Sequence, residues 1–342
     1  MPTGVPIEFS RVTKTFGAVT AVNDLSFSVE PGRVTGFLGP NGAGKTTSLR
    51  ILLGLVRPTS GTATFGGTAY ARLPQPLVTV GAALEAASFH PGRTARDHLG
   101  VYAAAAGIAA PRVGEVLDRV GLGEYANRRV GGYSLGMRQR LGLAYTLLGD
   151  PGVLVLDEPI NGLDPEGIKW IRLFLRELAA EGRTVLVSSH LLSEVQQSVD
   201  EVVIIAKGEL VHRGSLATLD TDVAPRVVVE SPDRIRLAEV LRSEGLEFTE
   251  GRTGLLVADP DPARIGHLAF VNQVEISALH RQKAGLEESF LTLVGDAEAS
   301  AAAGHAPAED AGPAAAVVHD PPPDAAPSPP VEPAPDSEGG AR

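Results

Sequence analysis

The sequence has no cysteine among its 342 residues, which excludes disulfides and any zinc or redox site built on thiolates. No apolar run approaches the roughly 18 residues that a membrane-spanning helix needs, and the richest stretch, residues 101–110, is too short. The first six residues lack the basic and apolar regions of a secretory signal peptide. The overall composition, with 43% hydrophobic and 21% charged residues, is typical of a soluble globular protein.

The net charge of −11 argues against a general nucleic-acid binder. Nine acidic residues and one arginine fall from Asp296 onward, so most of this charge belongs to the C-terminal end. Ten of the 26 prolines fall there too, which is too many for a packed element. We therefore expect a disordered tail over residues 296–342, either an inert solvated segment or a mobile acidic arm that binds a partner.

Residues 39–47 match the pattern G-x-x-x-x-G-K-[ST] at every fixed position. Residues 34–38 before them predict a buried strand, and residues 46–55 after them are apolar at helical spacing. A glycine-rich loop in this place can wrap its backbone N–H groups around phosphate. The pattern predicts that Lys45 reaches the β- and γ-phosphates and that the Thr46 hydroxyl ligates Mg²⁺. The alternative is a glycine-rich turn with an exposed lysine. The loop residues are Gly39, Pro40, Asn41, Gly42, Ala43, Gly44, Lys45, Thr46 and Thr47.

Two carboxylates follow the apolar residues 153–156, which predict a strand buried on both faces of a parallel sheet. Open α/β sheets bind ligands at the carboxyl ends of their strands. We predict that Asp157 holds Mg²⁺, directly or through water, and that Glu158 orients or deprotonates the attacking water. The alternative is an acidic strand end exposed to solvent. Residues 184–189 predict a neighbouring strand, which would bring His190 to the γ-phosphate or the water, although a lone histidine after a strand is usually structural.

Three further positions have weaker local signals. Phe16 lies in a predicted loop, where an aromatic ring can stack on a base or pack in a core. Residues 77–80 predict a strand, and Glu85 after it is either a functional group or a solvated surface carboxylate. Residues 134–136 precede a predicted helix over residues 137–148. A helix N-terminus is a place for an anion, but many helices begin with a serine that is only a cap.

Taken in order, these elements resemble the nucleotide-binding subunit of an ABC transporter. The resemblance implies that Phe16 stacks on adenine, that Asp164 helps two subunits communicate and that His190 senses the γ-phosphate. It also implies that Ser134 and Gly136 contact the γ-phosphate of ATP bound to the other subunit. The elements that carry it are Phe16, the loop 39–47, Ser134, Leu135, Gly136, Asp157, Glu158, Asp164 and His190.

Two departures from the usual pattern narrow the resemblance. Leu135 removes a glycine that would allow close approach, so the contact to the second ATP is expected to be looser. Glu85 stands where a glutamine normally senses Mg²⁺ and faces the membrane partner. Both changes resemble exporters of the bacitracin, lantibiotic and daunorubicin type, in which Glu85 is expected to ligate Mg²⁺ or to contact the permease. The altered signature is Tyr133-Ser134-Leu135-Gly136-Met137 in place of Leu-Ser-Gly-Gly-Gln.

The resemblance covers roughly residues 7–215 and implies an α/β P-loop ATPase fold with a central parallel sheet. An antiparallel β subdomain and an α-helical subdomain, at about residues 86–150, complete the ATPase domain over residues 1–220. Residues 221–295 change in character and predict a small α+β accessory domain. The tail, residues 296–342, follows.

The implied function is ATP hydrolysis that powers export of a drug, peptide or lipid-like substrate. ATP and Mg²⁺ are the implied cofactors. A second ATPase subunit, arranged head to tail and expected to make a homodimer, is one implied partner. A separate polytopic membrane permease is the other, and no nucleic acid is implied. The chain is therefore expected in the cytoplasm, peripherally on the cytoplasmic face of the cell membrane.

The rival interpretation is a soluble ABC ATPase that acts on ribosomes or DNA. Members that act in translation usually carry two cassettes, and repair members carry coiled-coil arms or zinc-binding cysteines. This chain has one cassette, no long heptad insertion and no cysteine. A non-hydrolytic regulatory binder is a third possibility, which the presence of Glu158 and His190 disfavours.

Overall fold

The structure is a computed structural model, which describes residues 3–84, 89–219, 226–251, 253–258, 261–282, 286 and 290–295. Its centre is a six-stranded sheet in the order β5-β6-β7-β3-β8-β9, parallel except for the β8–β9 pair. Strands β3 and β6 are buried at every residue, as expected for parallel strands covered on both faces. The strands are β3 (Val34–Leu38), β5 (Val80–Ala83), β6 (Val153–Leu156), β7 (Thr184–Ser189), β8 (Glu201–Ala206) and β9 (Glu209–Ser215).

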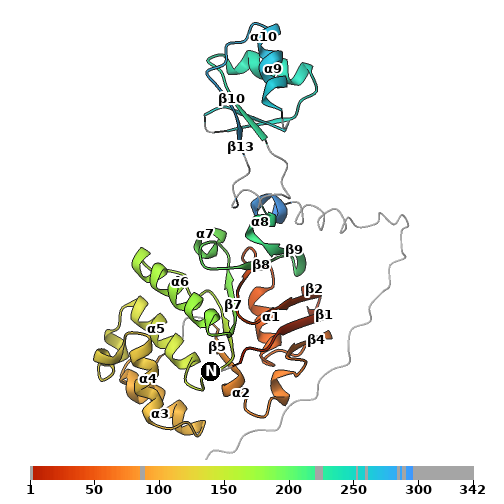
Figure 1. Cartoon of the computed structure of the whole chain (residues 1–342). Helices are drawn as coiled ribbons and strands as arrows, with labels where there is room; N and C mark the ends of the chain where they lie inside the picture. The colour runs from red at the N-terminus through yellow and green to blue at the C-terminus, as the bar shows by residue number, and fades with distance from the viewer. Residues whose placement is uncertain are drawn as a thin grey trace, which may run out of the picture. The chain divides into compact units, whose positions relative to one another are not determined.

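A second, antiparallel sheet in the order β2-β1-β4 packs on one side of the central sheet, with helix α1 (Lys45–Leu52) nearby (Figure 1). Phe27 of β2 makes the contact between the sheets. Its ring stacks on Phe9 of β1 at 4.5 Å and on Phe37 of β3 at 5.4 Å, centroid to centroid. Aromatic pairs of this kind add to the energy of apolar burial. The strands are β1 (Ile7–Phe16), β2 (Val19–Val29) and β4 (Ser60–Phe65).

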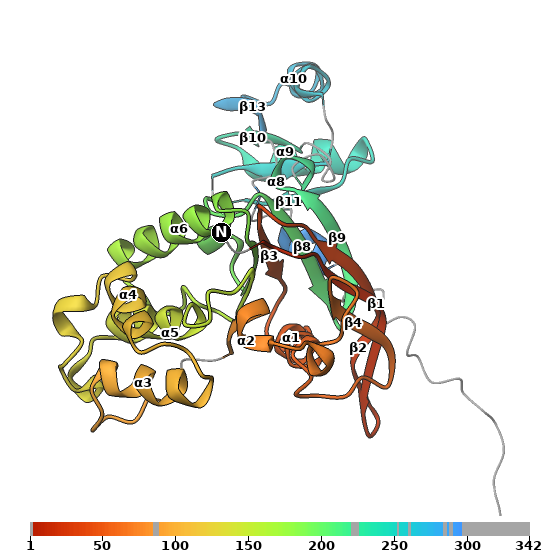
Figure 2. The same cartoon turned by 60° about the horizontal axis from the view of Figure 1, so that its bottom comes forward.

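A helical layer covers another side of the central sheet, and Figure 2 shows α3, α4 and α5 gathered together, away from β1, β2 and β4. One hydrophobic cluster joins Leu117 of this layer to Leu154 of β6 and Leu175 of α6. The long helices are α3 (Ala95–Ala105), α4 (Pro111–Arg119), α5 (Leu135–Thr146) and α6 (Pro165–Ala180). Short helical turns are α2 (Pro76–Thr79), α7 (Leu192–Val195), α8 (Leu216–Leu219), η1 (Tyr70–Arg72), η2 (Gly123–Tyr125) and η3 (Val130–Gly132).

The C-terminal part has its own four-stranded antiparallel sheet in the order β11-β12-β10-β13. The chain order strand-helix-strand-strand-helix-strand with this strand order is the ferredoxin-like arrangement. It has a separate hydrophobic cluster, which includes Val227, Leu241 and Ile265. Its elements are β10 (Arg226–Glu230), α9 (Arg234–Ser243), β11 (Phe248–Glu250), β12 (Leu255–Val257), α10 (Pro262–Val271) and β13 (Ala278–Gln282).

After this small sheet the chain contributes again to the large hydrophobic cluster. Phe290 and Val294 are buried in the same cluster as Leu219 at the end of α8. The predicted domain boundaries at residues 220/221 and 295/296 fall at or beside residues outside the described ranges and stay predictions. The same holds for the predicted tail, which lies outside them.

The strand predicted over residues 77–80 is wrong. Residues Pro76–Thr79 form the helical turn α2, and β5 starts only at Val80. Proline at the first helical position has its φ fixed near the helical value and lacks only an N–H that would have no partner there. The backbone N–H groups of Val78 and Thr79 both donate to Gln75 O at 3.2 Å. The apolar residues Leu77 and Val78 therefore lie in a helical turn and not in a strand.

None of the helices that the structure describes is long and apolar enough to cross a membrane.

Candidate active site

Residues 39–44 form the loop that joins β3 to α1, and residues 45–47 of the motif are the start of α1, in the place that the sequence pattern predicts. The loop glycines are required by conformation and by space. Gly44 has φ 103°, and an added Cβ there would lie 2.4 Å from the carbonyl oxygen of Ala21. At Gly39 an added Cβ would lie 2.3 Å from the carbonyl oxygen of Ile205. Any side chain at either position would therefore displace the backbone that holds the loop.

Lys45 is buried at the start of α1. Its Nζ donates to Gly39 O at 2.7 Å and to Pro40 O at 3.2 Å, and it lies 3.7 Å from Glu158 Oε1. Burial lowers the pKa of Lys45, while the charges of Glu158 and Asp157 partly offset the fall. The loop thus holds a cation beside the two carboxylates that follow β6.

Asp157 is buried between the loop and the neighbouring strand β7. Thr46 Oγ1 donates to Asp157 Oδ2 at 2.9 Å, and Ser188 Oγ donates to Asp157 Oδ1. The Ser188 hydroxyl also accepts a hydrogen bond from the Glu158 backbone N–H at 2.9 Å. Ser188 therefore fixes both carboxylate residues, and the sequence pattern gave no signal for it beyond its place two residues before His190.

Glu158 and His190 come together as adjacent parallel strands predict. The His190 Nδ1 lies 2.9 Å from Glu158 Oε2. Glu158 has φ 50°, a left-handed conformation that is uncommon for a residue with a side chain. A carboxylate held by a histidine and 3.7 Å from the Lys45 ammonium has the arrangement of a general base kept in one orientation.

Lys45, Thr46, Glu158 and His190 line one open hollow of about 400 Å³. Ala21 and Asn161 also line it, and neither was predicted. The lining residues are Ala21, Asn41, Gly42, Gly44, Lys45, Thr46, Thr47, Glu158, Asn161 and His190.

The oxygen atoms of Thr46 and Asp157 fit a magnesium ion. Mg²⁺ prefers oxygen ligands and takes only one or two from the protein beside phosphate and water. Within the described ranges, no group of three or more His, Cys, Asp or Glu side chains could hold a metal. A hydroxyl and a carboxylate 2.9 Å apart suit an ion that also binds phosphate.

Ser134, Gly136 and Asp164 line a different hollow of about 280 Å³, which shares no lining residue with the first. Ser134 Oγ accepts from the Met137 N–H at 3.2 Å, and Asp164 Oδ1 accepts from the Gly167 N–H at 3.0 Å. Both side chains therefore cap the helices that follow them. Leu135 is 45% exposed beside them.

Two predicted residues remain, Phe16 and Glu85, and Phe16 lines neither hollow. The prediction that Phe16 lies in a loop is wrong, because Phe16 is the last residue of β1 and pairs with Val19 of β2. Its side chain is 50% exposed, with the Lys14 ammonium 4.7 Å from its ring centroid. An exposed ring is available for stacking, and the core alternative does not fit it. Glu85 lies in residues 85–88, outside the described part of the chain.

Comparison with known proteins agrees with this geometry. Residues 22–161 match a family model described as ABC transporter, and residues 225–287 match a domain of unknown function. A Nod factor export ATP-binding protein I from Burkholderia lata is 36% identical over 301 residues, which cover 85% of this chain and 97% of that protein. A bacitracin transport ATP-binding protein from Bacillus licheniformis is 45% identical over 209 residues, which cover 60% of this chain and 68% of that protein.

A solved structure of an ATP-binding subunit of an ABC transporter is similar with a TM-score of 0.57 and 26% identity. The match covers 63% of this chain and 92% of that chain. The predicted fold class and the resemblance to exporters of the bacitracin type are confirmed.

Proposed function

We propose a function for this chain from one premise: it belongs to the ATP-binding proteins of ABC transporters, and its activity is that of an ATPase. The chain powers export of a drug, peptide or lipid-like substrate through a separate membrane permease. The name of one relative, for Nod factor export, supports the direction, and the name of the other, for bacitracin transport, supports a drug or peptide substrate.

The observation that carries the catalytic part is the convergence of Lys45, Thr46, Glu158 and His190 on one hollow. The loop N–H groups and the Lys45 ammonium bind the phosphates of ATP and offset their charge. Glu158 accepts a proton from the attacking water, and His190 keeps its carboxylate in place. Phe16 stacks on the adenine.

Thr46 and Asp157 would hold the magnesium ion, with Glu85 as a further ligand or as the contact to the permease. When bound, Mg²⁺ would neutralise negative charge that develops on the transferring phosphoryl group. Ser188 orients the Asp157 carboxylate toward the proposed magnesium site. Thr46, Asp157 and Ser188 would therefore determine where the ion meets the phosphates.

Two copies of the chain form a head-to-tail dimer, with Ser134 and Gly136 of one copy over the ATP of the other. Supporting this, these two residues line a hollow separate from the phosphate loop of their own chain. The capped N-terminus of α5 presents N–H groups to an anion. Asp164, in the same hollow, takes part in communication between the copies. Closing and opening of this dimer couples hydrolysis to transport.

The permease docks near residue 85 and the alanine-rich helix α3, at the cytoplasmic face of the membrane. A mostly apolar cavity of about 230 Å³ supports this place, because Tyr102 of α3 and Tyr145 of α5 line it with Leu77. Leu77 in its lining is exposed, and so is Val101 of α3. Such a concave apolar surface suits a short amphipathic segment of a partner.

A pull-down tests the proposal. Glu158→Gln with an affinity tag is held with ATP in the native cells, solubilised gently and analysed by mass spectrometry. Lys45→Ala in the same background is the matched control, since it should lose the ATP-held state. Recovery of a polytopic membrane protein only with the first variant is expected. Recovery of ribosomal or DNA-bound proteins without a membrane protein would overturn the transport function.

A further inference from the structure

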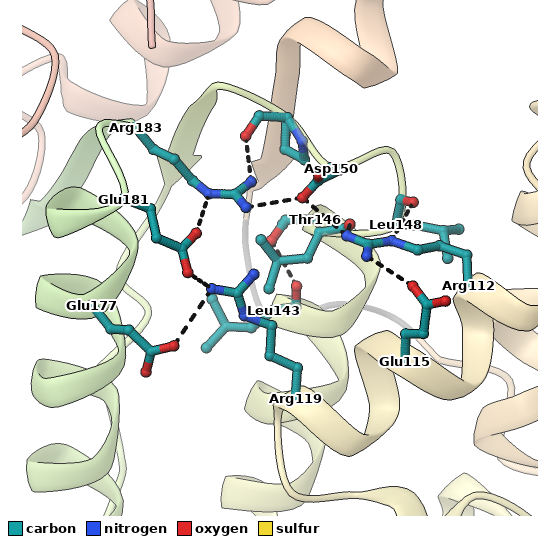
Figure 3. Close-up of polar contacts among 12 residues, drawn as sticks. Arg112, Glu115, Arg119, Leu143, Thr146, Leu148, Asp150, Glu177, Glu181 and Arg183 are labelled. Carbon is teal, nitrogen blue, oxygen red and sulfur yellow. Dashed lines mark hydrogen bonds and ion pairs between the residues drawn. The ribbon is translucent and has the colours of Figure 1, made fainter. Parts of the chain in front are cut away.

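A group of charged residues connects α4, the end of α5, the end of α6 and the start of β7 (Figure 3). We call it the charged joint and define it as Arg112, Arg119, Asp150, Glu181 and Arg183. At its centre lies Arg183, which is only 1% exposed. Arg183 donates to Glu181 Oε2 at 2.9 Å, to Asp150 Oδ1 at 2.9 Å and to Pro151 O at 2.7 Å.

Arg112 of α4 holds the end of α5. Its Nη2 donates to Leu147 O at 3.0 Å and to Asp150 Oδ1 at 3.1 Å, and its Nε donates to Leu148 O at 3.4 Å. The last carbonyl groups of a helix have no partner within the helix. Arg112 therefore supplies hydrogen-bond donors to the carbonyl groups at the end of α5, where the segment that leads into β6 begins.

Arg119, two turns farther along α4, connects the same layer to α6. It forms an ion pair with Glu181 and a second one with Glu177 at 3.5 Å. Its guanidinium also lies 5.9 Å from the ring centroid of Phe174. Helix α4 is thus attached at two points, once to the α5–β6 connection and once to α6.

The position of the charged joint along the chain gives it a functional meaning. Helix α5 starts at its cap Ser134 and ends in the joint, and β6 leads from the joint to Asp157 and Glu158. A helix and a buried strand are both stiff, so the connection between α5 and β6 determines the direction of α5 relative to the site. Space there is tight, because an added Cβ at Gly149 would lie 2.1 Å from Leu77 O.

We propose that the charged joint is a positioning device that fixes Ser134 and Gly136 relative to the catalytic residues of the same chain. A buried ion pair is weak evidence for stability, because desolvation offsets its attraction. Its hydrogen bonds nevertheless have fixed directions, and the planar guanidinium fork holds its acceptors in one geometry. The inference rests on the proposed function, in which Ser134 and Gly136 act on the ATP of a second copy.

This role predicts a split between two measurable steps. Binding of ATP to one subunit uses the phosphate loop, which the joint does not contact, so the affinity stays within about twofold of the original. Turnover requires the correct placement of two half-sites, and a displacement of about 1 Å can cost on the order of 100-fold. Loss of the joint should therefore lower kcat and the dimer population while ATP affinity is kept.

The test uses Arg112→Met in the full chain. Glu115→Gln is its matched control, because Glu115 pairs with the same arginine at 3.1 Å within α4 and is 61% exposed. Equilibrium ATP binding, steady-state kcat and the ATP-held dimer in the Glu158→Gln background are measured for each. We expect Arg112→Met to reduce both kcat and the amount of ATP-held dimer by about 10- to 100-fold. Glu115→Gln should change neither quantity.

A second variant covers the case in which Arg112→Met does not fold. Asp150→Asn keeps the shape of the side chain and suits the positive φ of 55° at this position, and the same split between kcat and affinity is expected. A lower melting temperature with unchanged kcat and dimer in the folded variant would overturn the positioning role.

Ser134→Arg separates this inference from the proposed function, because it blocks the signature residues directly. If Ser134→Arg abolishes turnover and the joint variants do not affect it, only the positioning role fails. If Ser134→Arg also has no effect, the head-to-tail mechanism fails and the positioning role fails with it.

Discussion

The hollow at the phosphate loop and the hollow at Ser134 are built in opposite ways. In the first, functional side chains bond to one another across elements: Thr46 to Asp157, and His190 to Glu158. In the second, Ser134 and Asp164 bond to the backbone of their own helices. Folding of one chain therefore brings the interacting side chains of the first hollow together. Ser134 and Asp164 in the second hollow cap their own helices, so any role beyond capping requires a partner molecule. Changes at the first should alter chemistry in every state, and changes at the second only in an assembly.

The largest expected effect breaks the first hollow. Glu158→Gln removes the general base with little change in shape, so kcat should fall by about 10²- to 10⁴-fold while ATP still binds. Phosphate release measured beside equilibrium ATP binding checks both parts, with Glu115→Gln as a carboxylate control. Near-native turnover would remove Glu158 from the role of base.

Lys45→Ala should weaken ATP binding rather than slow the chemistry alone. Hydrogen bonds to charged groups contribute about 1.5–3 kcal/mol, so the Kd for ATP should rise by about 10- to 100-fold. Titration calorimetry measures the change, and Lys169→Ala, at an exposed position of α6, is the control. An unchanged Kd would contradict the assignment of the loop.

Ser134→Ala sharpens the comparison because it probes the second hollow. It should cost about 1 kcal/mol of folding stability through the lost cap and lower kcat by about 10-fold through a lost contact to a charged phosphate. Thr94→Ala removes a similar cap on α3, where Thr94 Oγ1 accepts from the Asp97 N–H at 3.0 Å. Equal stability losses with equal kcat would show that Ser134 is only a cap.

The smallest expected effect depends on pH and concerns the charged joint. Burial raises the pKa of Asp150, but the hydrogen bond and charge of Arg183 and the charges of Arg112 and Arg119 outweigh it, so the pKa lies below its ordinary value. The carboxylate is therefore favoured in the folded state. Ionised Asp150 therefore adds to the free energy of unfolding above its pKa in the unfolded chain, about 3.9. This contribution is lost as the pH falls through the lower pKa of Asp150 in the folded chain.

Because the Asp150 side chain is 47% exposed, solvent screening limits this stabilisation to about 1 kcal/mol or less. Urea unfolding of the original chain and of Asp150→Asn should differ most near neutral pH. The difference should shrink below about pH 4 as the carboxylate takes up its proton. A difference that stays the same across that range would contradict the titration of Asp150.

The sequence predicted that Lys45, Glu158 and His190 lie close together, because each follows a strand or starts a helix that the local pattern identifies. It missed Ser188, since a serine inside a buried strand looks like any other strand residue until its neighbour strand is known. The turn over Pro76–Thr79 was missed for a different reason: a short apolar run does not distinguish a strand from a helical turn.

Contacts between distant segments explain the rest of what the sequence did not predict. The members of the charged joint look like ordinary surface charges in sequence, because Arg112 and Arg183 meet only through Asp150 once α4 and β7 are packed. The order β11-β12-β10-β13 likewise depends on which strands pair, and the alternation of apolar residues does not encode that choice.

The burial of Leu219 and Phe290 in one cluster has a consequence for modularity. The ferredoxin-like segment enters and leaves from the same hydrophobic cluster, so it is an insertion held at both ends rather than an appended end. Excising it and bridging the two anchors with a short linker keeps both of them in the cluster. A single protease cut on either side of the segment would therefore leave it covalently attached on the other side.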